Sequence, residues 1–177
     1  MTVTIRPRRE EDIPALAAVL VRVHELDGYP VEGVADPEGW LRHDRELQSW
    51  TAAEDGQPVG QVTLLRAAPN DDAARVWHDY TGGAIESLAI PARLFVDPDR
   101  RGNGAGRLLM ETAFDSAWTQ GLDVAFDVML KDRAAIRLYE WLGAERIADL
   151  THQYGDGRTE PAAVYVVSGS PTSNATT

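Results

Sequence analysis

Hydrophobic and polar residues recur along the chain with periods that predict both strands and helices. Alternation, or a short apolar run, predicts seven strands at 2–7, 47–53, 59–65, 87–96, 123–130, 144–150 and 160–168. Spacings of three and four predict helices after Asp12, around 37–43, after the glycines at 102–106 and after Asp132, which takes the capping position. This order predicts one α/β (α+β) domain with a mixed, mostly antiparallel sheet flanked by helices.

Three segments interrupt the pattern. Residues 68–83, APNDDAARVWHDYTGG, are polar and predict a connection long enough to be an insertion. Pro91 lies within the strand 87–96 and cannot donate a ladder hydrogen bond, so we expect that strand to bulge or split nearby. Residues 168–177 are rich in Ser and Thr and predict a disordered tail, which leaves a domain over 1–167.

Composition narrows the chemistry. The 177 residues include 28 acidic and 17 basic side chains, and this net charge of −11 disfavours nucleic acid and suits a cationic small molecule. There is no cysteine, and the four histidines have no metal-binding spacing, so we expect no metal site. Because neither a membrane-spanning run nor a signal peptide is found, we expect a cytoplasmic protein that does not bind membranes.

A glycine-rich turn precedes the helix that follows the strand 87–96. Its sequence, DRRGNGAGR at 99–107, places glycines at 102, 104 and 106 among arginines. The first N–H groups of a helix have no partner within it, and glycines let the backbone approach a bulky ligand. A phosphate or pyrophosphate therefore fits this turn, although the P-loop motif and the dinucleotide fingerprint are both absent. The alternative is a turn that serves only tight packing.

Two sequence blocks resemble the GCN5-related N-acetyltransferase (GNAT) superfamily. The family's cofactor loop, [RQ]-x-x-G-x-[GA], is matched by Arg101, Gly104 and Gly106. The second block, DRAAIRLYEWLGAERI at 132–147, resembles N-x-x-A-I-x-L-Y-E-x-x-G but has Asp132 in place of the asparagine. The resemblance implies a single GNAT-like domain in which the strand ending at Val96 splays from the strand 124–129.

The resemblance also implies acetyl-CoA as the acetyl donor. Its pantetheine arm would lie between the splayed strands and hydrogen-bond their backbone like an added strand. Backbone N–H groups of the glycine-rich turn would hold its pyrophosphate. The implied cofactor-binding residues are Leu94, Phe95, Val96, Arg101, Gly102, Asn103, Gly104, Ala105, Gly106, Arg107, Asp132, Ala135 and Tyr139.

Three residues are candidates for proton transfer. The resemblance matches Tyr139 to a tyrosine that protonates the departing thiolate in many members, while its apolar helical stripe favours simple core packing. The acceptor amine must lose a proton before it attacks the thioester, and 88–96 contains no acid. Glu86, just before that strand, and Asp127, on the neighbouring strand, are therefore the candidate bases. A base is unnecessary if the amine binds neutral or if water carries the proton.

The segment 24–40 is the candidate acceptor site, since the resemblance places specificity there. Its carboxylates and aromatic rings would attract an ammonium group and cover its carbon skeleton, and the candidates are Glu25, Asp27, Tyr29 and Trp40. We expect an N-acetyltransferase that transfers acetyl to the primary amine of a small molecule by direct attack in a ternary complex. The alternatives are acetylation of a protein N-terminus or lysine, and a non-catalytic acyl-CoA-binding module. The resemblance also suggests a homodimer.

Overall fold

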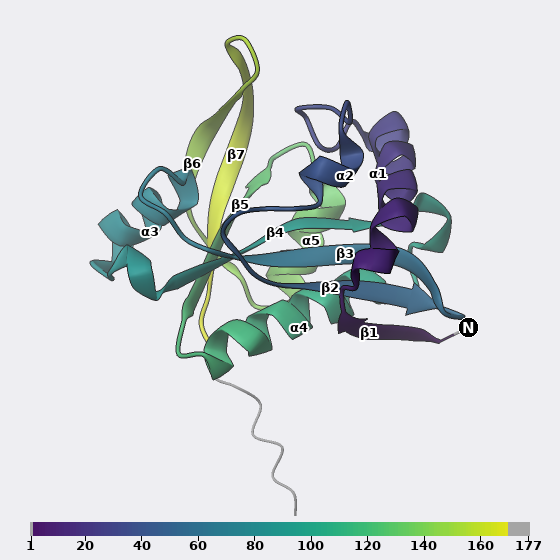
Figure 1. Ribbon diagram of the computed structural model, residues 1–177. Coiled ribbons are helices and arrows are strands. Elements are labelled where there is room, and N and C mark those ends of the chain that lie inside the picture. Colours follow the sequence, from purple (N-terminus) through teal and green to yellow (C-terminus); the bar gives the residue numbers. More distant parts are fainter. Residues whose placement is uncertain (1, 170–177) are drawn as a thin grey trace, which may run out of the picture.

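The computed structural model describes residues 2–169, which form one seven-stranded sheet with helices packed against it (Figure 1). The strands are β1 (Val3–Pro7), β2 (Glu46–Glu54), β3 (Gln57–Arg66), β4 (Leu88–Val96), β5 (Asp123–Met129), β6 (Glu145–Tyr154) and β7 (Arg158–Val167). The α-helices are α1 (Ile13–Asp27), α2 (Pro37–Trp40), α3 (Asp72–Thr81), α4 (Ala105–Thr119) and α5 (Arg133–Trp141). Single 3₁₀ turns are η1 (Glu10–Asp12), η2 (Ile85–Ser87) and η3 (Pro98–Arg100).

The sheet is mixed and mostly antiparallel, as the element order predicts. The strands lie in the order β1-β2-β3-β4-β5-β7-β6, and every neighbouring pair is antiparallel except β4 and β5. The helix α4 crosses between these two parallel strands. In Figure 1 the long β6–β7 hairpin extends beyond the sheet on one side, and α1 lies beside α2 on the other.

Two hydrophobic cores cover opposite faces of the sheet. Phe95 belongs to the core built by α1, whose buried members include Ile13, Leu16, Leu20 and Val23. Its neighbours Leu94 and Val96 pack against the larger core built by α4, which includes Leu109, Met110 and Ala113. Because successive strand residues point to opposite faces, α1 and α4 sandwich the end of β4.

The strands β4 and β5 separate after their first residues, which confirms the expected splay. They pair only at Leu88 with Asp123 and at Ala89 with Val124. Beyond these pairs β4 stays paired with β3, and β5 with β7, so the gap widens toward Val96 and Met129.

The expected irregularity near Pro91 is a bulge two residues further along β4. Ala92 lies opposite Thr63 and Phe95 opposite Gln61, so Arg93 and Leu94 together face the single residue between them on β3. Arg93 has a φ of +59°, in the left-handed region that non-glycine residues seldom adopt. The bulge therefore re-aims the backbone at the point where the strands part.

One expectation was wrong. The polar connection 68–83 contains the helix α3, which buries Ala73, Ala74 and Trp77. Its polar face is exposed, and only a narrow apolar stripe signals the helix. Most of the predicted tail, from 170 onward, lies outside the described residues, and Gly169 lies against the Trp118 ring.

Among residues 2–169, no helix combines the length and the apolar content that crossing a membrane requires. The same residues contain no group of three or more His, Asp or Glu side chains that could hold a metal ion.

Candidate active site

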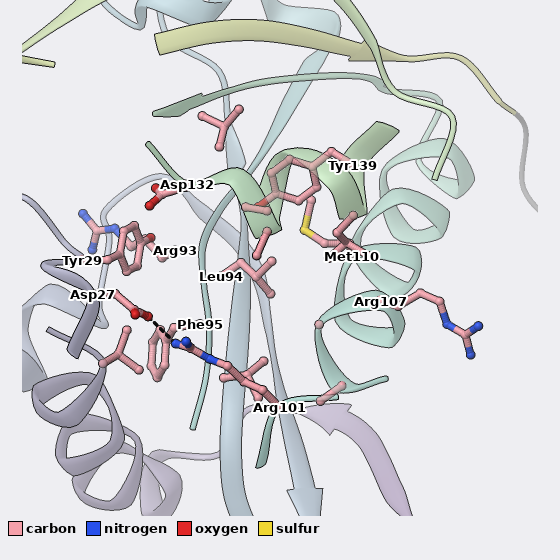
Figure 2. Close-up of a pocket in the computed structure, with 18 of the residues that line it drawn as sticks. Asp27, Tyr29, Arg93, Leu94, Phe95, Arg101, Arg107, Met110, Asp132 and Tyr139 are labelled. Atoms are coloured by element: carbon pink, nitrogen blue, oxygen red, sulfur yellow. Dashed lines mark hydrogen bonds and ion pairs between the residues drawn. The ribbon is translucent and has the colours of Figure 1, made fainter. Parts of the chain in front are cut away.

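A pocket of about 870 Å³ fills the gap between the splayed strands β4 and β5 (Figure 2). Its walls come from β4, β5, the start of α4, α5 and the end of α1. Every residue that the resemblance implied for cofactor binding lines it: Leu94, Phe95, Val96, Arg101, Gly102, Asn103, Gly104, Ala105, Gly106, Arg107, Asp132, Ala135 and Tyr139. The fold thus brings the end of β4 and the glycine-rich turn together with α5, which follows them in the sequence after α4 and β5.

The glycine-rich turn presents unpaired backbone donors to this pocket. The first hydrogen bond of α4 runs from the Leu108 N–H to the Gly104 carbonyl, at 3.0 Å. Within the described chain, the N–H groups of Gly106 and Arg107 have no acceptor, whereas that of Ala105 donates to the Asn103 side chain at 3.1 Å. The helix dipole adds positive potential at these groups, so they form an anion site.

Glycine is required at position 104 for two reasons. Its φ is +87°, and a Cβ built there would meet no protein atom within 4 Å. A side chain would therefore strain the backbone and project into the space where an anion would approach the donors. Gly102 has the same character, with a φ of +84° and open space around its Cβ position.

The arginines of this turn are already engaged within the protein. Arg101 pairs with Asp27 at 2.5 Å across the pocket, from the loop to the end of α1 (Figure 2). The guanidinium of Arg107 lies 5.6 Å from the centroid of the Trp141 ring and points away from the pocket interior in Figure 2. The positive potential that this turn offers to the pocket therefore comes from its backbone donors.

Tyr139 lies at the inner end of the pocket. Its ring meets Phe126 edge to face, with centroids 4.7 Å apart, and only 8% of the residue is exposed. Burial, with a smaller effect of Asp132, raises the pKa of Tyr139 above its ordinary value. Tyr139 lines the pocket, and its hydroxyl has no hydrogen-bond partner among the described residues. The Tyr139 hydroxyl therefore stays protonated and is free to donate a hydrogen bond into the pocket.

The two candidate bases lie in different places. Asp127, on β5, lines the pocket, and burial raises its pKa above that of a free aspartate. Glu86, in η2, is exposed and does not line the pocket. It precedes the paired start of β4, whereas the pocket opens at the strand's other end, so Glu86 lies away from this pocket.

Asp132 sits at the N-cap of α5 but makes no capping hydrogen bond. Its half-buried carboxylate lines the pocket, and burial raises its pKa. In Figure 2 the carboxylate lies on the side of Tyr29, across the pocket from Tyr139. The expected cap is therefore absent, and the carboxylate is available to a ligand.

The four candidate acceptor residues divide into two pairs. Asp27 and Tyr29 line the pocket, and burial strongly raises the pKa of Tyr29. Glu25 is exposed and points to a shallow surface depression beside Arg22, away from the pocket. Trp40 is a packing residue, since its ring contacts Tyr29 edge to face at 5.9 Å and Phe95 at 6.2 Å. Glu25 lies on the side of α1 that faces away from the pocket, because successive residues of an α-helix are rotated by about 100° about its axis.

Sequence reasoning missed Arg93, at the β4 bulge. Its side chain lies over the Trp40 ring at 4.7 Å and donates to the carbonyls of Trp40 and Arg42. Burial lowers the pKa of Arg93. The contacts of Arg93 with Trp40 and Arg42 hold the loop that carries Tyr29 and Trp40 against β4. The bulge expected near Pro91 was the only sequence signal close to it.

Comparisons with known proteins agree with this geometry. Residues 14–144 match the model of the Acetyltransferase (GNAT) family. A Staphylococcus aureus N-acetyltransferase has 18% identity and a TM-score of 0.70, covering 94% of this chain and 98% of that one. A Brucella melitensis ribosomal-protein-alanine N-acetyltransferase has 21% identity and a TM-score of 0.72, covering 93% of this chain and 98% of that one. A putative Salmonella typhimurium acetyltransferase, solved with acetyl-CoA, has 19% identity and a TM-score of 0.70, covering 94% of this chain and 94% of that one.

No protein with a curated description matches this sequence. The family match nevertheless spans most of the chain and includes both the glycine-rich turn and Tyr139. The solved structures share this fold over more than nine-tenths of the chain. This chain therefore belongs to the GNAT family of acetyltransferases and is an acyltransferase.

Proposed function

We propose that this protein transfers the acetyl group of acetyl-CoA to the primary amine of a small molecule, by direct attack in a ternary complex. One observation carries the proposal: the gap between β4 and β5 joins free backbone donors at one end to Tyr139 and Asp127 at the other. An anion site and two groups that exchange protons thus share one pocket.

The pocket fits acetyl-CoA as its donor substrate. The unpaired N–H groups of Gly106 and Arg107 suit a pyrophosphate, and the open space beside Gly104 admits it. The parted edge of β4, at 94–96, offers backbone to the pantetheine arm. When bound, acetyl-CoA supplies a thioester carbonyl that an amine can attack.

Two side chains move the protons of the reaction. The amine forms a bond to the acetyl carbon as the carbon–sulfur bond breaks, so nitrogen loses one proton and sulfur gains one. Asp127 accepts the proton from nitrogen, directly or through water, because its raised pKa makes it a stronger base than an ordinary aspartate. Tyr139 donates the proton to sulfur, because its raised pKa keeps its hydroxyl protonated.

The acceptor side of the pocket supports a small molecule. Tyr29 packs on Trp40, and Arg93 ties the loop carrying both rings to β4, so that wall is fixed by aromatic contacts and hydrogen bonds. The cavity of about 870 Å³ lies within the size range of small-molecule and cofactor sites. A pocket with one such fixed wall suits a compact amine better than an extended chain.

The test is a screen of acceptors with acetyl-CoA, in which free thiol and acetylated product are both measured. Small primary amines are compared with peptides that carry a free N-terminus or a lysine. We expect thiol release matched by acetylation of at least one small amine. Transfer confined to peptides would replace the proposed acceptor by a protein, and thiol release without any acetylated product would remove the transferase assignment.

A further inference from the structure

The carboxylate of Asp132 is unusual for a residue at a helix N-cap. Aspartate is favoured at that position because its side chain accepts hydrogen bonds from the first turn, yet Asp132 makes none. It also forms no ion pair within residues 2–169, although it is half-buried in the pocket wall. A partly desolvated carboxylate without a partner is costly, which indicates that its partner is a ligand.

The nearby cations do not neutralise Asp132. Its neighbour Lys131 pairs instead with Glu160, at 3.7 Å. Arg93, across the same end of the pocket, donates to the carbonyls of Trp40 and Arg42. Arg101 is paired with Asp27. These three cations are thus engaged elsewhere, and Arg133, which also lines the pocket, forms no ion pair with Asp132, so this carboxylate is left open.

A second unpartnered group lies beside it. Tyr29 is half-buried against Trp40, lines the pocket, and its hydroxyl has no hydrogen-bond partner in the described chain. Figure 2 shows the Asp132 carboxylate close to the Tyr29 ring, with Tyr139 on the far side of the pocket. The Tyr139 hydroxyl is likewise unpartnered, and 92% of that residue is buried. These groups line one space, with Asp132 and Tyr29 on one side and Tyr139 on the other.

We propose that Asp132 and Tyr29 form the acceptor's ammonium-binding site, so that the protein selects amines that arrive protonated. The carboxylate attracts the alkylammonium group and the Tyr29 hydroxyl accepts one of its N–H bonds. The Tyr29 ring, which Trp40 holds in place from behind, covers the attached carbon chain. This inference rests on the proposed function. The bound ammonium first loses one proton to water, and Asp127 accepts the second proton as the carbon–nitrogen bond forms and Tyr139 protonates the departing sulfur.

The test compares two isomeric amines with acetyl-CoA: benzylamine, which is protonated at neutral pH, and 4-methylaniline, which is neutral. Wild type should prefer benzylamine. Asp132→Asn keeps the shape and removes the charge, so kcat/KM for benzylamine should fall about 10- to 100-fold, mainly through KM, with little change for 4-methylaniline. Tyr29→Phe should act in the same direction and more weakly. Asp79→Asn makes the same change on the exposed face of α3 and should alter neither rate.

Two results would overturn the inference and leave the proposed function standing. One is an equal loss for both amines in Asp132→Asn. The other is a rise confined to the KM for acetyl-CoA, since that would make Asp132 a contact of the donor. Transfer to neither isomer, nor to any amine of the acceptor screen, would overturn the proposed function itself. Near-ultraviolet circular dichroism of each variant verifies that the fold is retained.

Discussion

The side-chain amide of Gln61, on β3, donates a hydrogen bond of 2.9 Å to the carbonyl oxygen of Arg93, at the bulge of β4. The amide oxygen of Gln61 accepts from Arg8 at 2.8 Å, and the same nitrogen of Arg8 donates to the Leu41 carbonyl. Gln61 is fully buried. The bulge that shapes the pocket is therefore held by a buried chain of hydrogen bonds that starts beside β1.

Replacing Gln61 by leucine should weaken both stability and donor binding. The change leaves the Arg93 carbonyl and part of the Arg8 guanidinium without a partner, at a cost of about 1–3 kcal/mol for each group. Urea unfolding should show this loss, and the KM for acetyl-CoA should rise as the bulge relaxes. Thr63→Val removes a buried hydrogen bond to Ser49 in the same sheet and should lower stability with no change in KM. Equal KM effects in the two variants would contradict a specific role for Gln61.

Gly104→Ala should reduce affinity for acetyl-CoA more than it reduces stability. Alanine at a φ of +87° costs about 1–2 kcal/mol of backbone strain, and its methyl group enters the anion site. Gly82→Ala imposes similar strain at a φ of +73°, at the end of α3, where no ligand approaches. Thermal unfolding should fall comparably in both variants, and calorimetry should show weaker binding only for the first. Unchanged binding in Gly104→Ala would remove the turn from the donor site.

Tyr139→Phe should lower kcat about 10²-fold and leave acetyl-CoA affinity nearly intact, because the ring still packs on Phe126 and only the donor hydroxyl is lost. The raised pKa of Tyr139 predicts that wild-type activity does not decline near pH 10 through loss of this proton. The measurement is steady-state kinetics together with calorimetry. A wild-type rate in the phenylalanine variant would reduce Tyr139 to a packing residue.

Asp127→Asn should lower kcat/KM and remove the acid limb of the pH–rate profile. In the wild type the carboxylate must be ionised to accept a proton, so activity falls as pH drops through its pKa. Burial raises that pKa, which places the limb above that of an ordinary aspartate. Glu86→Gln changes an exposed carboxylate outside the pocket and should leave the profile unaltered. The reverse pattern would make Glu86 the base.

Asp12 should control stability in acid. It accepts two hydrogen bonds of 2.7 Å from Arg6, and these lower its pKa from 3.8 to about 2. A lowered folded-state pKa contributes stability that is complete above 3.8 and is lost as pH falls toward 2. Asp12→Asn should therefore lose about 2 kcal/mol at neutral pH and show a flatter stability profile between these values. Glu11→Gln, on an exposed neighbour, should leave the profile intact.

Sequence pattern was sufficient for much of the fold. The periodicity of apolar residues predicted all seven strands, α1, α4 and α5, because side-chain spacing reports locally which face is buried. The helix α3 was not predicted, because its buried apolar stripe is short and lies among polar residues. Its burial against β5, β6 and β7 is a property of the folded sheet.

The chemistry of the site divides in the same way. The glycine-rich turn and Tyr139 were predictable, since a helix start with flexible backbone and a tyrosine in a matched block are local features. The position of the other candidate residues depended on the tertiary structure. Glu86 and Glu25 lie outside the pocket, and Asp132 makes no capping hydrogen bond and lies on the Tyr29 side of the pocket. The bulge at Arg93 depends on a buried amide more than thirty residues away. Direction and burial of a side chain arise only when distant segments pack together, and they determine which carboxylate can meet an amine.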